Sequence, residues 1–368
     1  MNTYEDYVYD NFTGNESDYE TDDHRCRFSS LRGSNVFMPV MYYLIFFTGF
    51  WGNLLVISVV GSQGKRRSRL VDTFVVNLAL ADLIFVITLP LWAISTSQDN
   101  QWSFGSASDL LCKLSSYIIS VNRFSNIFFL TCMSVDRYLA IVKMMDSRYL
   151  RSSQCIRITC AALWITSLVL GIPSLVYRKV ASSNGQQYCM EVRDSMFFLC
   201  MNLAIALLTF IFPVFIIALC YGNIVMHLNR HCVASGNPRT EARRKHSLKM
   251  VLCIIVAFVV SWLPYNTFKS TATISSLAKV NLSCETEFWL GNGLLISCCL
   301  AFFNSCVNPA IYFFLDHHFR RRATVLYKNC TGKPKLLQSF NSSVSFTNAG
   351  TSETCATSGG RSPLQMSP

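Results

Sequence analysis

Seven long runs of apolar residues, separated by short polar connections, set the pattern of the chain. The runs lie at about 37–60, 70–95, 110–142, 155–177, 196–226, 248–273 and 287–315. A helix needs roughly 20 apolar residues to cross a bilayer, and each run is long enough. Lipid offers no hydrogen-bond partner to an open backbone, so such runs must be helical. The pattern therefore predicts an all-α membrane protein built as a seven-transmembrane helix bundle.

The segments outside this bundle differ sharply from one another. Residues 1–36 are predicted to be an acidic tail, because the first 23 residues hold eight Asp and Glu and no Lys or Arg. The bundle occupies 37–315. Residues 316–330 are basic and amphipathic, which suits a short helix on the membrane surface. Residues 331–368 are rich in Ser and Thr and are predicted to be a disordered tail.

Lysine and arginine gather on alternate connections, and this sets the orientation. The connections after the first, third and fifth runs are basic, as is the segment after the seventh. Basic residues stay on the cytoplasmic side, so the N-terminus is outside and the C-terminus inside. The net charge of +11 thus reflects membrane topology. No basic domain stands alone, which argues against nucleic acid as a partner. The seven apolar runs predict a multi-pass protein of the cell membrane.

The outer face carries the chemistry of an oxidising compartment. N-glycosylation acceptors occur on this side at Asn11, Asn15 and Asn281. Four cysteines also lie on this side: Cys26, Cys112, Cys189 and Cys284. Their even number suggests two disulfides. Four cysteines allow three connectivities, and the residues alone do not choose between them.

One acid, Asp82, lies in the middle of the second run, where an ionisable group is costly unless it is paired or hydrated. Other spans carry polar residues at a comparable depth: Asn53, Asn122, Ser125, Asn304 and Asn308. These could surround Asp82 and hold a small cation, such as an allosteric sodium ion. The alternative is hydrogen bonding between helices without an ion. No other cofactor is expected, and the sequence shows no Cys or His spacing typical of a metal site.

Arg123 is a second charge within an apolar run. It follows Cys112 by eleven residues, which places it about 16 Å below the outer membrane edge in a helix. Such an arginine needs an acid, water or a ligand group. It can anchor a ligand carboxylate or pair with internal polar groups, and both interpretations stay open at the level of sequence.

The stretch SVDRYLAIV places Asp136 beside Arg137 at the inner end of the third run. A single basic residue at a helix end can extend to the interface. That explanation does not account for the acid next to it. The adjacent acid and base therefore predict a functional role for this pair at the cytoplasmic end of the helix.

Together these residues resemble the rhodopsin-like, class A G-protein-coupled receptors over about 37–328. Every span carries its own motif. The motifs are Gly52-Asn53, Leu78-Ala79 with Asp82, Asp136-Arg137-Tyr138, Trp164, Pro213 with Tyr221, Trp262-Leu263-Pro264, and Asn308-Pro309 with Tyr312. Ser261 replaces the cysteine that commonly precedes Trp262. The resemblance implies no enzymatic activity.

Two further motifs are typical of the chemokine and peptide branch of the family. They are Thr88-Leu89-Pro90 followed by Trp92, and Trp102-Ser103-Phe104-Gly105 before Cys112. The branch implies the disulfides Cys112–Cys189 and Cys26–Cys284. It also implies a secreted peptide or small protein as ligand, coupling to inhibitory G proteins, and regulation by receptor kinases and arrestin. Leukocyte chemotaxis would fit such a receptor. Cys298 stands near the depth where many chemokine receptors carry an acid, so ordinary chemokine binding is not expected.

The resemblance also assigns roles to individual residues. The expected ligand pocket contains Trp92, Tyr117, Arg123, Trp262, Tyr265 and Lys269. The expected activation and G-protein-coupling set contains Asp136, Arg137, Tyr138, Tyr221, Pro264, Asn308, Pro309 and Tyr312. In the family pattern Asp136 holds Arg137 at rest and releases it on activation.

Two modifications are expected at the ends of the chain. Tyr4, Tyr7, Tyr9 and Tyr19 lie among acids, the setting in which tyrosines are sulfated. Cys330, after the basic segment, is a candidate for palmitoylation and contact with membrane lipid. The alternatives to a signalling receptor are a decoy that binds without signalling, or a transporter or channel. The intact Asp136-Arg137-Tyr138 motif opposes the decoy, and the lack of an internal repeat opposes a transporter.

Overall fold

A computed structural model describes residues 31–62, 70–143, 152–183, 185–192, 195–231 and 238–331. Within these ranges seven helical runs are long and apolar enough to cross a membrane. They are Ser34–Gly61, Val71–Ser97, Gly105–Ile141, Ser153–Val176, Met196–His227, Leu248–Leu277 and Cys284–Leu315. The predicted seven-span architecture is confirmed. The spans begin or end a few residues from the predicted bounds.

Ten α-helices make up these spans and the segment that follows them, among the residues described. They are α1 (Ser34–Gly61), α2 (Leu70–Val86), α3 (Leu89–Ser97), α4 (Ser108–Ile141), α5 (Ser153–Val176), α6 (Met196–Ala206), α7 (Phe212–His231), α8 (Pro238–Leu277), α9 (Cys284–Leu315) and α10 (His317–Thr331). Ser152 and Ser283 cap α5 and α9, since each hydroxyl accepts a hydrogen bond from a first-turn backbone N–H.

Prolines explain why two spans consist of more than one segment. Pro90 has no N–H for the carbonyl of Val86, where α2 ends and α3 soon begins. The hydroxyl of Thr88 donates to the Phe85 carbonyl at this break (2.8 Å). In the fifth span Pro213 follows a π-helical segment, Leu207–Ile211, that joins α6 to α7. These breaks redirect the helices without interrupting the crossing.

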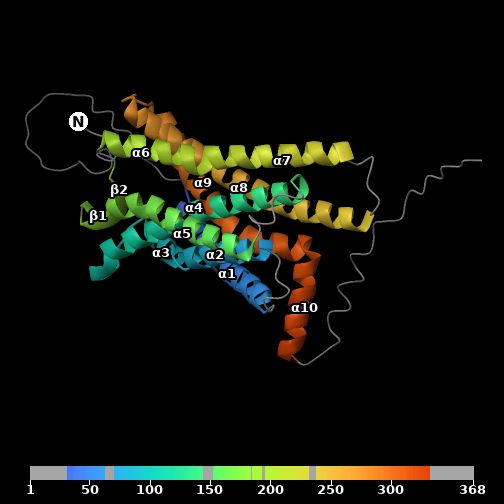
Figure 1. Cartoon of the computed structure of the whole chain (residues 1–368). Helices are drawn as coiled ribbons and strands as arrows, with labels where there is room; N and C mark the ends of the chain where they lie inside the picture. The colour runs from blue at the N-terminus through green and yellow to red at the C-terminus, as the bar shows by residue number, and fades with distance from the viewer. Residues whose placement is uncertain are drawn as a thin grey trace, which may run out of the picture. The chain divides into compact units, whose positions relative to one another are not determined.

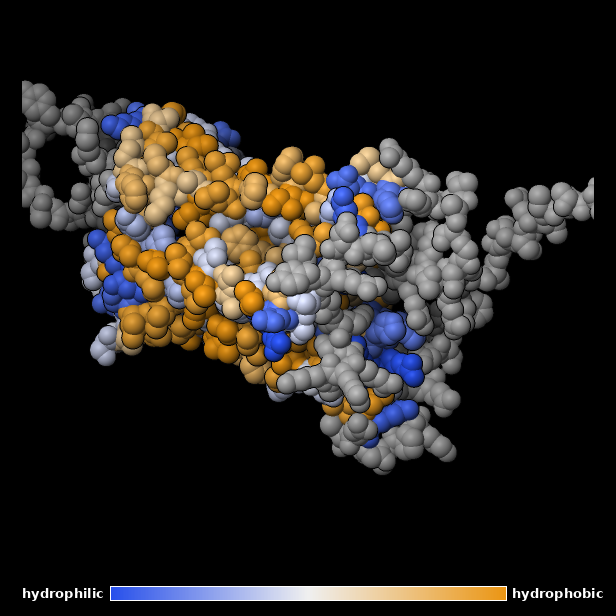
Figure 2. Space-filling model, in the orientation of Figure 1, coloured by the Kyte–Doolittle hydropathy of each residue, from blue (hydrophilic) through white to orange (hydrophobic). Residues whose placement is uncertain are grey.

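Helix α4 is the central element of the bundle, with α2, α5, α7 and α8 in contact with it. α1 packs against α2, α3 and α9, and α8 packs along α9 (Figure 1). The outward faces of the spans are apolar. Figure 2 shows orange side chains over most of the visible surface of the spans, with blue ones toward their ends. Trp51 on α1 and Phe215 on α7 are 64% and 60% exposed, as lipid-facing side chains are.

A β-hairpin lies at the outer end of α4, and the sequence reasoning did not predict it. Strand β1 (Arg178–Ser183) pairs antiparallel with β2 (Gln186–Glu191), with Val180 opposite Cys189. Gly185 in the turn has a φ of 76°, which only glycine adopts readily. A disulfide from Cys189 to Cys112 ties the hairpin to α4. The hairpin is thereby held beside the open end of the bundle.

Helix α10 begins two residues after α9 ends and confirms the predicted helix after the seventh span. Asp316 accepts a hydrogen bond from the backbone N–H of His318 (2.8 Å). Phe319 is buried against Tyr312 of α9, with ring centroids 6.2 Å apart. Arg322 forms an ion pair with buried Asp72 of α2 (2.8 Å). Arg322 is also the last residue of the first of two structural units in the chain, and that unit contains the whole bundle.

Candidate functional site

A cavity of about 250 Å³ lies among the spans below the hairpin. Side chains from α1, α3, α4, α5, α6, α8 and α9 line it, together with one residue from each strand. Four of the six predicted pocket residues are among them: Trp92, Arg123, Tyr265 and Lys269. The structure thus brings together residues that are up to 177 positions apart in the sequence, counted from Trp92 to Lys269.

Arg123 of α4 lies in this cavity with no acid in hydrogen-bond contact among the residues described. Its guanidinium carbon is 4.6 Å from the ring centre of Phe124 and 5.8 Å from that of Tyr265. Its Nε is buried without a hydrogen-bond partner in the described part of the chain. Cation–π contacts compensate only part of the cost of removing a guanidinium from water. Arg123 is therefore a buried cation whose charge is not matched by a hydrogen-bonded acid among the residues described.

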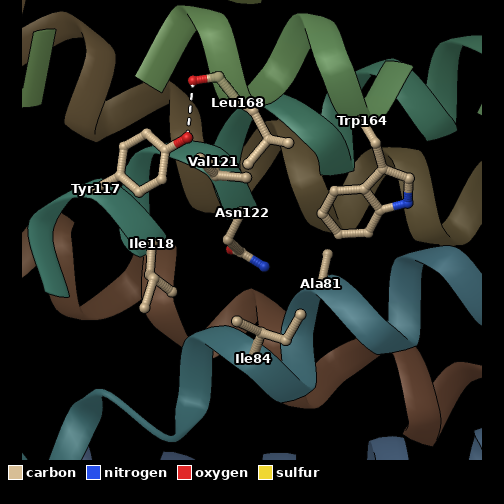
Figure 3. Close-up of a pocket in the computed structure, with 8 residues that line it drawn as sticks. All are labelled: Ala81, Ile84, Tyr117, Ile118, Val121, Asn122, Trp164 and Leu168. Carbon is tan, nitrogen blue, oxygen red and sulfur yellow. Dashed lines mark hydrogen bonds between the residues drawn. The ribbon is translucent and has the colours of Figure 1, made fainter. Parts of the chain in front are cut away.

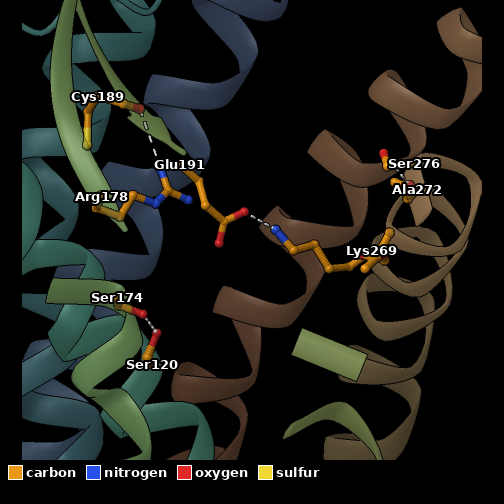
Figure 4. A network of polar contacts seen from close by, with 9 residues as sticks. Ser120, Ser174, Arg178, Cys189, Glu191, Lys269, Ala272 and Ser276 are labelled. Atoms are coloured by element: carbon orange, nitrogen blue, oxygen red, sulfur yellow. Dashed lines mark hydrogen bonds and ion pairs between the residues drawn. The ribbon is translucent and has the colours of Figure 1, made fainter. Parts of the chain in front are cut away.

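An ion pair crosses the cavity between the hairpin and α8. Lys269 Nζ donates to Glu191 Oε2, and the two side chains are 19% and 16% exposed (Figure 4). On the hairpin side, Arg178 donates to the Cys189 carbonyl (3.4 Å). Among the residues described, three cationic side chains thus line the cavity against one acidic side chain. The lining has a positive excess, which suits an anionic ligand group.

Two predicted pocket residues lie elsewhere. Tyr117 is on the flank of α4 that faces α5, and its hydroxyl donates to the Leu168 carbonyl (3.0 Å). Helical spacing explains the correction, because Tyr117 lies one position after the cavity residue Ser116, a rotation of about 100° around α4. Trp262 is buried in α8 outside the cavity lining, with its ring 5.7 Å from that of Tyr265. It supports a lining residue instead of contacting the cavity.

Several lining residues were missed by sequence reasoning: Tyr42, Arg178, Glu191 and Cys298 as a pocket residue. Arg178 and Glu191 are brought to the cavity by the hairpin. The available sequence signal for that hairpin was Asn184-Gly185, a dipeptide common in tight hairpin turns. Tyr42 depends on how α1 packs, which no local pattern reveals. Cys298 stood at the right depth, and the structure places it in the cavity.

A separate polar cluster surrounds Asp82, which is fully buried. Its Oδ1 accepts hydrogen bonds from Asn122 Nδ2 (2.9 Å), Asn126 Nδ2 (2.8 Å) and Ser305 Oγ (2.8 Å). Its Oδ2 accepts one from Asn308 Nδ2 (3.0 Å). Helices α2, α4 and α9 therefore meet at one carboxylate. The hydrogen bonds offset part of the cost of burying it.

The membership of this cluster differs from the prediction in two places. Ser125 donates to the Asn122 carbonyl of its own helix (3.1 Å) and not to the carboxylate. Asn304 is buried, but its Oδ1 has no hydrogen-bond partner within the described ranges. Asn126 and Ser305 make the contacts instead. Each lies one position along the helix from the predicted residue, a rotation of about 100° that sequence depth alone cannot distinguish.

Asn53 of α1 joins the cluster indirectly. Its Nδ2 donates to the Ser305 carbonyl (2.9 Å). That carbonyl lacks its helical partner, because the residue four positions later is Pro309. Gly52 permits the close approach, since a Cβ there would lie 3.0 Å from the Pro309 ring. The Gly52-Asn53 and Asn308-Pro309 motifs thus form one contact between α1 and α9.

Two of the amides that donate to Asp82, those of Asn126 and Asn308, each have an Oδ1 atom that is buried without a hydrogen-bond partner in the described residues. The Oδ1 atoms of Asn53 and Asn304 are buried in the same way. Carboxylate and amide oxygens are the donors that small hard cations prefer. The donor set fits the predicted sodium ion. No group of three His, Cys, Asp or Glu that could hold a metal occurs in the described parts of the chain.

The inner end of α4 carries the Asp136–Arg137 pair. Arg137 Nη2 lies 3.3 Å from Asp136 Oδ2, with side-chain exposures of 17% and 7%. Tyr221 of α7 and Tyr312 of α9 are buried, and their hydroxyls have no hydrogen-bond partner among the described residues. Tyr138 is half-buried on α4. The remaining predicted activation residues, Pro264 and Pro309, lie within α8 and α9.

The outer-face predictions have mixed outcomes. The Cys112–Cys189 disulfide is present, with Cα atoms 5.6 Å apart. Cys284 is also disulfide-bonded, whereas Cys26, its expected partner, lies outside the described residues. So do the sequons at Asn11 and Asn15, the N-terminal tyrosines and the tail from 332. Asn281 is exposed in the connection between α8 and α9, and its glycosylation stays a prediction. Cys330 falls in the last turn of α10, and its palmitoylation likewise stays a prediction.

Comparison with known proteins agrees with this geometry. Residues 52–312 match the family model described as 7 transmembrane receptor (rhodopsin family). This chain belongs to the rhodopsin family of seven-transmembrane receptors. It is 39% identical over 294 residues to G-protein coupled receptor 15 of Mus musculus, covering 80% of this chain and 79% of the relative. It is 37% identical over 301 residues to probable G-protein coupled receptor 25 of Mus musculus (81% and 80%). It is 35% identical over 321 residues to apelin receptor A of Danio rerio (84% and 87%).

Membership in the rhodopsin family settles the broad class. The chain is a multi-pass receptor of the plasma membrane and not an enzyme. Its relatives support a peptide-type receptor with a heterotrimeric G protein as partner. The runs RLVDTFVVNLALADL, LCKLSSY and GIPSLVYR predicted a similarity to receptors 15 and 25 within the family, and more to receptor 25. The similarity to both is confirmed, with the higher identity to receptor 15.

Proposed function

We propose that this receptor binds a secreted peptide or chemokine-like protein, one carboxylate-bearing end of which enters the cavity, and that it signals through inhibitory G proteins. The buried guanidinium of Arg123 is the observation that carries the proposal. It stands over two aromatic rings with its Nε unpaired in the described residues. A ligand carboxylate would supply the charge-assisted hydrogen bonds that this group lacks.

The rest of the cavity fits the end of a peptide with a bulky apolar residue. Trp92 and Tyr265 supply aromatic surface, and Leu295 and Phe302 add apolar surface on α9. The cationic excess of Arg178 and Lys269 over Glu191 adds attraction for an anion. An anionic group beside an apolar side chain, as at the C-terminus of a peptide, matches both features.

The acidic N-terminal tail supports a ligand whose body is basic. Its first 23 residues contain eight acids and no basic residue. Opposite charge accelerates encounter by long-range steering. Sulfated tyrosines in this tail would strengthen that attraction. The proposed ligand is therefore basic along its body and anionic at the end that enters the cavity.

The intact Asp136–Arg137 pair supports signalling over a decoy role. Ligand binding would shift a two-state bundle, with Pro213 and Pro264 allowing the inner ends of α7 and α8 to move. The inhibitory subtype, receptor kinases and arrestin acting on the Ser/Thr-rich tail, and a role in chemotaxis follow from the resemblance to the chemokine and peptide branch.

The ligand proposal is tested with paired synthetic peptides. Secreted basic peptides are made with a free C-terminal acid and as the C-terminal amide, and binding to receptor-bearing membranes is measured. The free acid should bind more tightly. If the active peptides bind equally well in both forms, and no internal acid replaces the terminus, the carboxylate anchor is wrong.

Replacement of Arg123 gives the matched test at the receptor. Arg123→Gln should weaken binding of the free acid by about 30-fold, which corresponds to roughly 2 kcal/mol for a lost charge-assisted hydrogen bond. The same substitution should change binding of the C-terminal amide only slightly. Arg123→Lys keeps the positive charge and should weaken binding of the free acid less than Arg123→Gln does. A variant that reaches the surface and weakens both forms equally would contradict the assigned role.

A further inference from the structure

An acidic side chain of the receptor itself enters the cavity between the spans. Within the described ranges Glu191 is the only acid in the cavity lining, and its Oε2 accepts a hydrogen bond from Lys269 Nζ. Figure 4 shows the Glu191 side chain extended from the hairpin toward Lys269, with Arg178 on its other side. Both members of the ion pair are largely buried, so their charges are screened less than those of a surface pair. The cavity therefore already contains a carboxylate that belongs to the chain.

The alternation of side chains along a strand explains why Glu191 points into the cavity. Glu191 ends strand β2 and lies two residues after Cys189, so the two side chains share one face of the strand. On that face Cys189 is bonded to Cys112 near the outer end of α4. The disulfide fixes the backbone two residues away from Glu191 and directs the acid inward. A carboxylate tethered in this way has a high effective concentration in the cavity.

Glu191 acts on all three cationic side chains of the described lining. Arg178 is its cross-strand partner in the hairpin, and Lys269 is in direct contact with it. Arg123 lies on α4, close enough for Glu191 to interact with it electrostatically. The Glu191 carboxylate therefore offsets part of the positive charge that a ligand carboxylate would use.

An acid in this position has two conceivable roles, and the charge balance of the cavity favours one of them. If Glu191 bound a basic group of the ligand, Lys269 would lose its anionic partner beside two arginines. If a ligand carboxylate replaced Glu191, Lys269 would keep an anionic partner, and Glu191 could turn toward the solvent at the hairpin. The replacement leaves fewer unmatched charges in a space with little water, where an unmatched charge is costly.

We infer that Glu191 is a tethered competitor of the ligand: its carboxylate occupies Lys269 and must be displaced by the carboxylate of a peptide. The inference rests on the carboxylate anchor proposed above and adds a way in which the cavity selects its ligand. Three uncompensated cations would also attract small organic acids from the outer solution. Competition by Glu191 lowers the affinity for every carboxylate, so a peptide with further contacts along the cavity is favoured over a small acid.

The inference is tested with two small probes, N-acetyl-L-leucine and N-acetyl-L-leucinamide, of which only the first is anionic. Each probe is titrated against the full-length receptor in phosphatidylcholine nanodiscs, and binding is followed by saturation-transfer NMR. A smaller hollow of about 110 Å³ lies between α2, α4 and α5 (Figure 3). None of the described residues that line this hollow is charged, so it offers the acid no cation.

Glu191→Gln removes the competing charge and keeps the shape of the side chain. This substitution should raise the affinity for the acid about tenfold, because the incoming carboxylate no longer meets a like charge. The affinity for the amide should not change. In a Lys269→Gln receptor the same substitution should raise the affinity for the acid only about twofold, since the contested cation is absent. The control Glu285→Gln removes an exposed acid in the first turn of α9, outside the cavity lining, and should change neither affinity.

Two results would overturn the inference. Equal affinity of the parent and the Glu191→Gln receptor for the acid would show that Glu191 does not compete. A lower affinity of the Glu191→Gln receptor would show that Glu191 assists the ligand. If Glu191→Gln does not fold, Glu191→Asp takes its place, because it withdraws the carboxylate from Lys269 by one methylene group and should give a smaller gain.

Arg123→Gln separates this outcome from a failure of the carboxylate anchor. If Arg123→Gln removes the preference for the acid while Glu191→Gln binds the acid like the parent, the anchor is correct and the competition is wrong. If the parent and the Glu191→Gln receptor both bind acid and amide alike, the anchor fails and the inference fails with it.

Discussion

Asp82 shows how a single ionisable residue organises its surroundings in the membrane. Its carboxylate accepts four hydrogen bonds from α4 and α9, and three of the donors are asparagine amides. Burying a carboxylate this deeply is costly unless donors replace the lost water. The cluster is thus a set of interdependent contacts, and the loss of one donor affects all three helices.

Replacing Asn126 tests this interdependence. Asn126→Ala removes one donor to the carboxylate and should lower the stability of the purified receptor by about 1–3 kcal/mol. The measurement is the thermal unfolding midpoint in detergent. Asn223→Ala is the matched control, since Asn223 is exposed and, within the described ranges, donates to the Leu219 carbonyl of its own helix alone (2.8 Å). Equal midpoints for the two variants would show that the cluster adds no stability.

The Asp136–Arg137 pair leads to opposite expectations for its two members. Asp136→Asn removes the acid 3.3 Å from the guanidinium and should raise ligand-independent signalling, because the arginine is released. Arg137→Ala should weaken G-protein coupling and leave ligand binding largely intact. Both are measured as nucleotide exchange on a G protein against surface expression. If both variants signal like the parent, Asp136 and Arg137 do not control activation.

At the scale of elements, the hairpin is the part of the fold that most directly shapes the cavity. It brings Arg178 and Glu191 to the cavity lining, while the Cys112–Cys189 disulfide joins it to α4. Val180 adds a second tie, as its N–H donates to Asp109 Oδ1 (3.2 Å). A third link is the hydrogen bond that the backbone N–H of Trp102 donates to the Gln187 carbonyl (2.6 Å).

Breaking the disulfide tests how much the hairpin depends on it. Cys112→Ser should cost about 2–5 kcal/mol of stability and weaken ligand binding, because Glu191 and Arg178 lose their fixed position. Thermal midpoint and surface expression report the first effect, and peptide binding reports the second. Cys200→Ser replaces an exposed free cysteine on α6 and should change neither. If the Cys112→Ser receptor binds peptide as tightly as the parent, the hairpin is not part of the ligand site.

The sequence predicted elements better than it predicted side-chain neighbours. Apolar run length determines where a helix crosses a bilayer, so all seven spans were found. Which face of a helix a residue occupies depends on packing, and an error of one position rotates a side chain by about 100°. This explains why Ser125 was expected where Asn126 makes the contact, and why Tyr117 was expected in the cavity.

Considered as a whole, the molecule uses α4 to connect three levels across the membrane. Arg123 lies in the cavity, Asn122 and Asn126 contact Asp82 at mid-depth, and Asp136 and Arg137 stand at the inner end. A helix is stiff along its length, so a small displacement at one level reaches the others. This arrangement gives a ligand outside a physical route to a G protein inside.

Residues chosen for their buried charge were placed well by sequence reasoning, because a charge in an apolar run has few tolerated environments. Arg123, Asp82 and Asp136 belong to this group. Sequence reasoning did not find Glu191, because it lies in a polar connection between two spans. An acid in such a connection is common, and only the fold shows that this one faces the cavity. Part of the cavity lining could therefore be predicted from the sequence. The Lys269–Glu191 ion pair could be recognised only from the structure.

The most direct test of the central claim is a G-protein sensor measurement in cells that express this receptor. Secreted peptides are applied with sensors for the inhibitory, stimulatory and other G-protein families, with and without pertussis toxin. A basic peptide with a free carboxylate should activate the inhibitory sensor in parent cells, and pertussis toxin or Arg137→Ala should abolish that response while binding persists. A peptide that binds the cavity with high affinity and activates none of the sensors would contradict the account.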